Sequence, residues 1–311
     1  MPTAFMTRRD GFLACGVLAE GRQFCNDLFF SVFRLLPSRS SSNATMMKIA
    51  LLIKQVPDTR TVRMDEKTGT VVRDGNEAIV NPLDLYALKA ALDLKAAQPG
   101  TTVTAISMGP PNAEKALKEA LALGADDALL ICDRAAAGSD TKATATILTA
   151  ALNASGPFDL VLTGERATDG DTGQVGPEIA AAAGFGLITF ANSVTATAGG
   201  IEVERKTENE VERWKVELPA LVSVTKAVGE VGLPTLKGKM VARRRVVPVK
   251  NTTELGLAPG NIGLEGSPTR VVRIFRPSIT RNGIKLQIFD EASLESAVDV
   301  LASFVKGEEK A

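Results

Sequence analysis

Short apolar runs alternate with helical patterns of apolar residues along the chain from Met47 to Gly184. Apolar runs typical of buried strands occupy 48–53, 102–108, 127–132 and 160–162, the last one ended by Thr163 and Gly164. Helical spacing covers 82–97, 113–123 and 141–154, and an alanine-rich helix is predicted from near Thr172 to Gly184. This alternation predicts an α/β fold with a doubly wound parallel sheet. Loops at the carboxyl ends of its strands are expected to meet at one crevice.

The pattern changes after Gly186. The stretches 187–194, 201–206 and 211–218 are typical of additional antiparallel strands with polar turns, and 219–224 of one more buried strand. Residues 228–234 are interrupted by glycines and are expected to be exposed, and Arg243, Arg244 and Arg245 are interpreted as a solvated basic face. The segment 251–285 has no strong periodicity, and 291–305 has the spacing of an amphipathic helix.

These patterns divide the chain into three parts. Residues 1–46 hold two of the three cysteines and a serine-rich run, and are interpreted as an extension that is disordered or outside the native fold. Residues 47–250 form the predicted nucleotide-binding α/β domain. Residues 251–311 form a predicted extended C-terminal arm and helix that pack on a partner subunit, because such a tail cannot bury itself within the main domain.

Composition excludes several classes of protein. The 311 residues carry 36 basic and 36 acidic side chains, so the net charge argues against a nucleic-acid binder. No apolar run approaches the ~20 residues of a membrane span. The chain contains no histidine, which excludes Ser-His-Asp and Cys-His catalysis and imidazole metal ligands. Cysteine spacing gives no metal site and is typical of a cytoplasmic protein.

The candidate site is the loop that follows the run 160–162. Strand, glycine-rich loop and helix start form an arrangement that presents free backbone N–H groups to an anion, here around Gly173 to Gly176. Asp169 and Asp171 would repel phosphate, and are better placed to cap the helix or to accept hydrogen bonds from ribose hydroxyls. An ordinary capped helix explains the same pattern about equally well.

A second helix start lies at Asn81-Pro82, with Asn as the cap and Pro in the first turn. Asn81 is interpreted either as a plain helix cap or as a ligand contact. The carboxylate of Asp84 would stabilise the helix through its dipole even without a role in binding. Thr172 and Met108 also have purely structural interpretations, Thr172 as a helix cap and Met108 as a packing residue. Asp171 and Gln174 are the strongest side-chain candidates.

Seven segments in register along the chain together indicate a family. From Met47 nearly to its end, the chain resembles the beta subunit of electron transfer flavoproteins, whose fold is adenine-nucleotide-alpha-hydrolase-like. The segments that carry the resemblance are 53–59, 81–84, 108–111, 169–177, 218–222, 237–240 and 266–269.

The resemblance implies an electron carrier subunit and not an enzyme. It implies a heterodimer with the electron transfer flavoprotein alpha subunit, which supplies most contacts to a shared FAD, while this subunit binds AMP or a second FAD. Dehydrogenase or quinone-reductase partners would dock near Val228. The implied cofactor-binding residues are Leu52, Asn81, Pro82, Leu83, Asp84, Met108, Gly164, Arg166, Ala167, Asp169, Gly170, Asp171, Thr172, Gly173, Gln174 and Val175.

The sequence departs from the family pattern at two places, of which the first removes a cationic residue at position 165, with Arg166 beside it as a replacement, and the second points to one branch. Glu165-Arg166 stands where many members have a basic residue followed by Gln, and Gly229 to Gly232 replaces the usual Asn-Glu-Pro-Arg of the docking loop. With the segment 54–59, the second departure resembles the electron-bifurcating or nitrogen-fixation-associated branch. It therefore favours a second FAD over AMP.

Two rival functions remain open. A nucleotidyl-transferring or ATP-hydrolysing enzyme of related fold would need His-x-Gly-His or Ser-Gly-Gly-x-Asp-Ser near its first strand, and the sequence has neither. An adenine-nucleotide-binding sensor without redox function would be a colourless monomer instead of a yellow heterodimer.

Overall fold

The computed structural model describes residues 4–9, 12–15, 46–58, 63–64, 71–72, 78–271 and 285–307. The chain forms two compact units, Met1–Arg270 and Val271–Ala311, which are described separately. The sequence-based interpretations of most of 1–45, of the loop 59–77 and of 272–284 lie outside the described residues.

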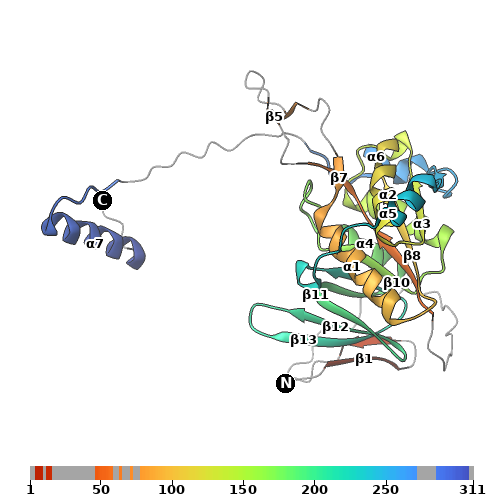
Figure 1. The fold of residues 1–311 in the computed structure, drawn as a ribbon, viewed down its shortest axis with the longest axis horizontal. Helices are drawn as coiled ribbons and strands as arrows, with labels where there is room; N and C mark the ends of the chain where they lie inside the picture. The colour runs from red at the N-terminus through yellow and green to blue at the C-terminus, as the bar shows by residue number, and fades with distance from the viewer. Residues whose placement is uncertain are drawn as a thin grey trace. The chain divides into compact units, whose positions relative to one another are not determined.

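The structure has the following strands and helices (Figure 1). The strands are β1 Ala4–Arg9, β2 Phe12–Cys15, β3 Lys48–Leu52, β4 Gln55–Pro57, β5 Arg63–Met64, β6 Val71–Val72, β7 Ala78–Val80, β8 Thr102–Met108, β9 Asp127–Ile131, β10 Leu160–Gly164, β11 Gly186–Thr197, β12 Gly200–Lys206, β13 Val211–Glu217, β14 Ala220–Val224 and β15 Val249–Lys250. The α-helices are α1 Pro82–Ala97, α2 Glu114–Leu123, α3 Thr141–Ser155, α4 Val175–Ala183, α5 Leu236–Arg244, α6 Gly263–Gly266 and α7 Glu291–Lys306. The 3-10 helices are η1 Pro111–Ala113, η2 Arg134–Ala136, η3 Lys226–Val228 and η4 Pro259–Asn261.

The main sheet has the strand order β15-β9-β8-β3-β10-β14-β11-β12-β13-β1-β2. Every neighbouring pair from β15 to β11 is parallel. From the first strand of this parallel part, β3, the chain adds β8 and β9 on one side and β10 and β14 on the other, so the direction of winding reverses between β3 and β10. A reversal of this kind opens a crevice at the carboxyl ends of the two strands.

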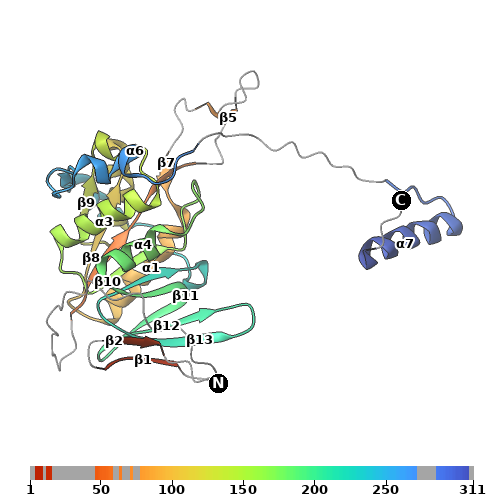
Figure 2. The same ribbon diagram turned by 180° about the vertical axis from the view of Figure 1, so that it is seen from behind.

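Helices cover both faces of the parallel strands. One core packs α1 and α2 on one face through Leu88 and Leu117, and the other packs α3 and α4 on the opposite face through Ile147 and Ile179. Figure 1 has α1 in front of the sheet, and the reverse view in Figure 2 has α3 and α4 in front. Strand residues alternate between the cores, because successive side chains of a strand point to opposite faces. The predicted doubly wound α/β fold is confirmed.

An antiparallel extension continues the sheet beyond β14. The first half of β11 pairs in parallel with β14, and its second half pairs with β12, which in turn pairs with β13. The predicted antiparallel strands are therefore confirmed. β1 pairs in parallel with β13, and β2 with β1. The hairpins β4–β7 and β5–β6 form two separate two-stranded sheets.

Two local predictions were wrong. β10 extends through Thr163 and Gly164 instead of ending before them. α4 begins at Val175 and not near Thr172, because Asp171 and Gly173 have φ angles of 54° and 65° and so cannot belong to a right-handed helix. Arg243, Arg244 and Arg245 are exposed, as interpreted, and the first two end α5, a helix that was not predicted.

The segment 251–270 belongs to the first compact unit, although the predicted arm begins at 251. The carboxylate of Asp133 accepts a hydrogen bond from the N–H of Thr252 at 3.1 Å, and that of Asp140 accepts one from the N–H of Thr269 at 3.0 Å. Asp140 also caps α3 by accepting from the N–H of Ala143. These contacts fasten the segment to the loop between β9 and α3.

In the second unit, α7 confirms the predicted amphipathic helix. It begins with a capping box formed by Asp290 and Ser293. Its large apolar side chains are exposed within this unit: Leu294, Val298, Leu301, Phe304 and Val305. Among the described residues, no helix combines the length and apolarity that crossing a bilayer would require.

Candidate functional site

The candidate site forms where β3 and β10 end. Ile49, Ala50 and Leu51 of β3 pair with the first residues of β10, so the chain leaves both strands at the same edge of the sheet. The loop after β10 runs from Glu165 to Gln174 and leads into α4. The segment after β3 leads by way of β4 and β7 to Asn81 and α1. The structure thus brings together the predicted residues near Leu52, Asn81 and Gly164.

Asn81 connects α1 to the loop after β10. Its side chain is fully buried and makes no cap to its own helix. Instead, Nδ2 donates to the carbonyl of Arg166 at 2.9 Å and Oδ1 accepts from the N–H of Thr168 at 3.3 Å. The interpretation of Asn81 as a plain helix cap was therefore wrong. Its amide positions the loop backbone.

Asp84 lies at the same junction and is 6% exposed. Its carboxylate accepts a hydrogen bond from the N–H of Lys54 at 2.8 Å. Burial raises the pKa of Asp84 to about 7, and interactions with the N–H of Lys54, the side chain of Asn81 and the N–H of Gly164 oppose this rise. Asp84 thus connects the end of β3, the start of α1 and the end of β10.

Asp169 and Asp171, the two loop residues that were considered as helix caps, both form ion pairs. Lys54 Nζ lies 2.7 Å from the Asp169 carboxylate. Arg166 Nε lies 2.9 Å from Asp171 Oδ1 and 3.7 Å from Glu165 Oε1. The prediction that these aspartates cap α4 was wrong, because the helix starts too late for them to reach its first turn.

The N-cap position of α4 belongs to Gln174, whose side chain makes no capping bond. No described residue accepts a hydrogen bond from the backbone N–H of Gly173, Gln174, Val175 or Gly176. Thr172 is exposed and two residues before the cap position, so it does not cap the helix. The four free N–H groups keep the electrostatic character of an anion site, in the loop and first turn.

A buried hydroxyl lies under this helix start. Thr163 is 8% exposed, and its Oγ1 has no hydrogen-bond partner. A Cβ added at Gly176 would lie 3.3 Å from that oxygen, so the glycine leaves space beside it. A buried hydroxyl without a partner costs about 1–3 kcal/mol. Its position therefore indicates a place where a polar group of a ligand, or a water molecule, is needed.

Other predicted residues take different positions. Met108 ends β8, the strand beside β3, and is half-buried against the α3–α4 core. Gln174 is exposed and its Oε1 lies 3.5 Å from the hydroxyl of Thr141 at the start of α3. Pro82 is exposed in the first turn of α1, and Leu83 is half-buried.

Sequence reasoning missed Lys54 and Thr163. Lys54 follows the first parallel strand directly, and a charged residue at that place is a signal that could have been used. Thr163 gave no signal, because it was interpreted only as the end of its strand. Among the described residues, no cluster of side chains could hold a metal ion.

Gly173 offers a direct test of the loop. Replacing it with valine places a β-branched residue at φ 65° and a Cβ 3.2 Å from the carbonyl oxygen of Glu165. If this loop binds a nucleotide, as the sequence predicts, we expect about 1–3 kcal/mol of local strain, loss of the nucleotide and a preserved fold. Nucleotide content after purification measures the loss of nucleotide, and circular dichroism measures whether the fold is preserved. Gly199→Val, in the turn between β11 and β12 and outside the predicted site, is the matched control, because a Cβ there meets nothing within 4 Å. Equal nucleotide content in the two variants would contradict the assignment of the loop.

Comparison with known proteins decides the family. A family model described as "Electron transfer flavoprotein domain" matches residues 68–255, more than half of the chain. The chain belongs to the electron transfer flavoprotein family.

Curated relatives match this family member over most of their length. The chain is 39% identical over 251 residues to "Electron transfer flavoprotein subunit beta" of Megasphaera elsdenii, covering 79% of this chain and 93% of that protein. It is 40% identical over 237 residues to "Caffeyl-CoA reductase-Etf complex subunit CarD" of Acetobacterium woodii, covering 76% and 90%. It is 41% identical over 238 residues to "Protein FixA" of Azotobacter vinelandii, covering 74% and 84%. The predicted resemblance to the beta subunit of electron transfer flavoproteins is confirmed.

Proposed function

We propose that this chain is the beta subunit of a heterodimeric electron transfer flavoprotein and that its crevice between β3 and β10 binds an adenine nucleotide. Its alpha subunit would share the redox-active FAD with it. Electrons would pass between partner oxidoreductases and the flavin. The observation that carries the proposal is the unpartnered Thr163 hydroxyl beneath the free N–H groups at the start of α4.

The residues of the crevice fit a phosphate group. The N–H groups of Gly173 to Gly176 are free donors, and Gly176 leaves the space that a side chain would fill. Backbone donors at a helix start bind an anion without a basic cluster. A bound flavin would supply the electron chemistry, and this chain would bind and orient the nucleotide.

The charges of the loop explain why carboxylates are tolerated beside such a ligand. Lys54 neutralises Asp169, and Arg166 neutralises Asp171. The paired carboxylates then repel a phosphate less than free ones would. They also keep acceptor oxygens that suit ribose hydroxyls. The predicted cofactor-binding residues remain our proposed contacts, with Asn81 and Asp84 positioning the loop and Thr163 added.

We favour a second FAD over AMP in this crevice. The departure at Gly229 to Gly232, together with the segment 54–59, supports this choice. One relative is named as a subunit of a caffeyl-CoA reductase–Etf complex, which supports a carrier that works with a partner reductase.

Two surfaces support the proposed partners. In the loop after β14, Val228 and Val231 pack against the core, whereas Leu233 is 96% exposed. We propose that dehydrogenases or quinone reductases dock on this loop. We also propose that α7 packs on the alpha subunit, because its exposed apolar stripe needs a cover.

The proposal is tested by co-expressing the chain with a candidate alpha subunit. We expect a yellow heterodimer that contains two FAD per dimer, measured by acid release and chromatography of the nucleotides. One FAD and one AMP would support the carrier function and reject the second FAD. A colourless monomer that retains only AMP would contradict the carrier function.

A further inference from the structure

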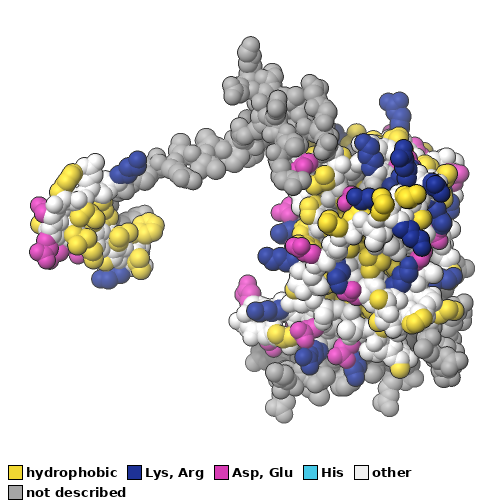
Figure 3. Space-filling view, viewed as in Figure 1, with side chains coloured by type: hydrophobic (Ala, Val, Ile, Leu, Met, Phe, Trp, Pro, Cys, Tyr) yellow, Lys and Arg dark blue, Asp and Glu magenta, His cyan; other side chains and the backbone are white. Residues whose placement is uncertain are grey.

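The loop after β10 carries a single cationic side chain, Arg166. It lies beside the free N–H groups at the start of α4, since a Cβ added at Gly173 would lie 4.0 Å from Arg166 Cβ. Charged side chains of both signs are spread over the face of the first compact unit that Figure 3 shows, so an exposed arginine does not by itself mark a site. The surroundings of Arg166 are what distinguish it.

The backbone that carries Arg166 is held by a fully buried side chain. Asn81 Nδ2 donates to the carbonyl of Arg166 at 2.9 Å, and its Oδ1 accepts from the N–H of Thr168 at 3.3 Å. These two hydrogen bonds fix the loop on both sides of Ala167. The Arg166 side chain therefore extends from a fixed point close to the start of α4.

Asp171 holds the other end of this side chain. Its Oδ1 lies 2.9 Å from Arg166 Nε. The N–H of Asp171 donates to the carbonyl of Ala167 at 2.8 Å, and its φ of 54° lies in the left-handed region, which aspartate tolerates better than most residues. This turn returns the Asp171 carboxylate to the arginine five residues earlier in the chain.

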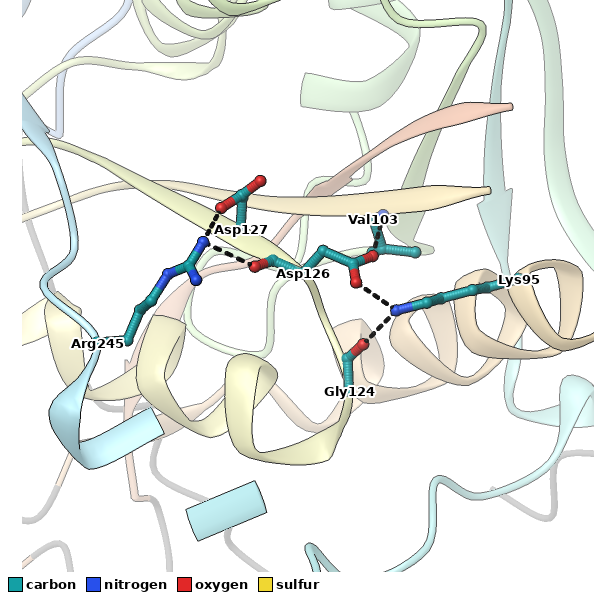
Figure 4. Close-up of polar contacts among 6 residues, drawn as sticks. All are labelled: Lys95, Val103, Gly124, Asp126, Asp127 and Arg245. Atoms are coloured by element: carbon teal, nitrogen blue, oxygen red, sulfur yellow. Dashed lines mark hydrogen bonds and ion pairs between the residues drawn. The ribbon is translucent and has the colours of Figure 1, made fainter. Parts of the chain in front are cut away.

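The N–H groups of the Arg166 guanidinium are nevertheless not used. The side chain is 48% exposed, and no described residue accepts a hydrogen bond from it. Arg245 provides the contrast (Figure 4), because its guanidinium donates to the carbonyl oxygen of Asp126 at 3.2 Å and forms a close ion pair with Asp127. Arg245 fastens the end of α5 to the start of β9, whereas Arg166 keeps its donors for another group.

The charges nearby leave one side of this guanidinium for an anion. Asp171 and Glu165 both approach Nε, at 2.9 Å and 3.7 Å, so the two Nη groups of the planar fork remain for a ligand. Lys54 cannot replace it, because its Nζ lies 2.8 Å and 2.7 Å from the two carboxylate oxygens of Asp169. Arg166 is thus the available cation beside the free N–H groups.

We propose that Arg166 binds the second phosphate of a nucleoside diphosphate group whose first phosphate is bound by the N–H groups from Gly173 to Gly176, and that Asp171 is the positioning residue of this arginine. A guanidinium donates two parallel hydrogen bonds to one phosphate group, and a neighbouring carboxylate restricts its orientation. The inference rests on the proposed nucleotide site and adds to it the residue that selects a diphosphate over a monophosphate. A nucleoside monophosphate offers Arg166 no second phosphate to bind.

The test measures the affinities of ADP and AMP for the purified full chain by isothermal titration calorimetry, after bound nucleotide has been removed with activated charcoal. We expect the native chain to bind ADP about tenfold more tightly than AMP. Arg166→Met keeps most of the apolar stem without the guanidinium, so it should weaken ADP binding about tenfold and leave AMP binding unchanged. Arg166→Lys keeps the charge but loses the planar fork, and its affinity for ADP should lie between those two.

Asp171→Asn tests the positioning role. Asparagine tolerates the same left-handed backbone but carries no charge, so ADP affinity should fall about threefold while AMP affinity stays constant. When Asp171→Asn is combined with Arg166→Met, it should cause no further loss of ADP affinity, because it acts only through the arginine. An equal loss of ADP and AMP affinity in Asp171→Asn would show that Asp171 shapes the loop and would overturn its positioning role.

Arg213→Met is the matched control. Arg213 forms a comparable exposed ion pair, with its Nε 3.1 Å from Glu204, in the antiparallel extension of the sheet. Both affinities should stay unchanged in this variant. Equal affinities of the native chain for ADP and AMP, or an equal loss of both in Arg166→Met, would overturn the proposal and leave the nucleotide site standing. Binding of neither nucleotide by the native chain would contradict the nucleotide site itself, and this inference with it.

Discussion

Gly164→Ala is expected to destabilise the protein and to release the nucleotide that we propose it binds. A Cβ at this position would lie 2.5 Å from Asp84 Oδ1 and 2.7 Å from the backbone carbonyl of Leu83. The side chain could turn away, but the backbone of Leu83 is fixed in the first turn of α1. We expect a loss of about 1–3 kcal/mol in the free energy of unfolding, measured by urea denaturation, because overpacking strains a closed core.

The control for this variant lies in the turn between β11 and β12, outside the proposed site. Gly199→Ala adds the same methyl group where nothing lies within 4 Å, so stability and nucleotide content should both stay near those of the native chain. Similar stability and nucleotide content in the two variants would show that the junction of β10 and α1 accommodates an added methyl group. Asn81 and Asp84 could not then be positioning residues.

Asp84→Asn is expected to change how stability depends on pH. Burial raises the pKa of Asp84 from its ordinary 3.8 to about 7 in the folded chain. Between these two values the folded chain holds a proton that the unfolded chain has lost, so this group makes the free energy of unfolding fall as pH rises from about 4 to about 7. The span corresponds to at most about 4 kcal/mol. Asn cannot ionise, so the fall should disappear.

Urea denaturation at several pH values between 4 and 8 measures this effect. The stability of Asp84→Asn relative to the native chain should rise with pH through this window and become constant above it. Asp93→Asn, on the exposed side of the same helix, is the control and should follow the native chain. Parallel curves for Asp84→Asn and the native chain would mean that the Asp84 carboxyl is not held neutral by its surroundings.

The fold was largely predictable because its signals are local. The run 102–108 became β8 with the same bounds, and the Asn81-Pro82 signal placed the start of α1 at Pro82. The helix α5 was missed because its apolar positions are few and only Ala242 is buried. The start of α4 was placed too early because the left-handed backbone of Asp171 has no marker in its residue type.

The meeting place of the candidate residues was predictable, but the contacts that each of them makes were not. Topology alone put Asn81 and the loop after β10 at one edge of the sheet. That the Asn81 amide holds the loop backbone depends on residues more than 80 positions apart, which no local pattern reports. The same holds for the ion pair of Lys54 with Asp169 and for the unpartnered hydroxyl of Thr163.

The dual pairing of β11 bears on how this protein can be cut or extended. Since one continuous strand borders β14 with its first half and β12 with its second, the hairpin β12–β13 is no detachable module. Deleting it would strip the partner from half of β11, the strand that covers the far side of β14. Foreign sequence is better tolerated in the turn between β11 and β12 at Gly199, which has open space around it, than at Gly200, which lies against the backbone of Val216.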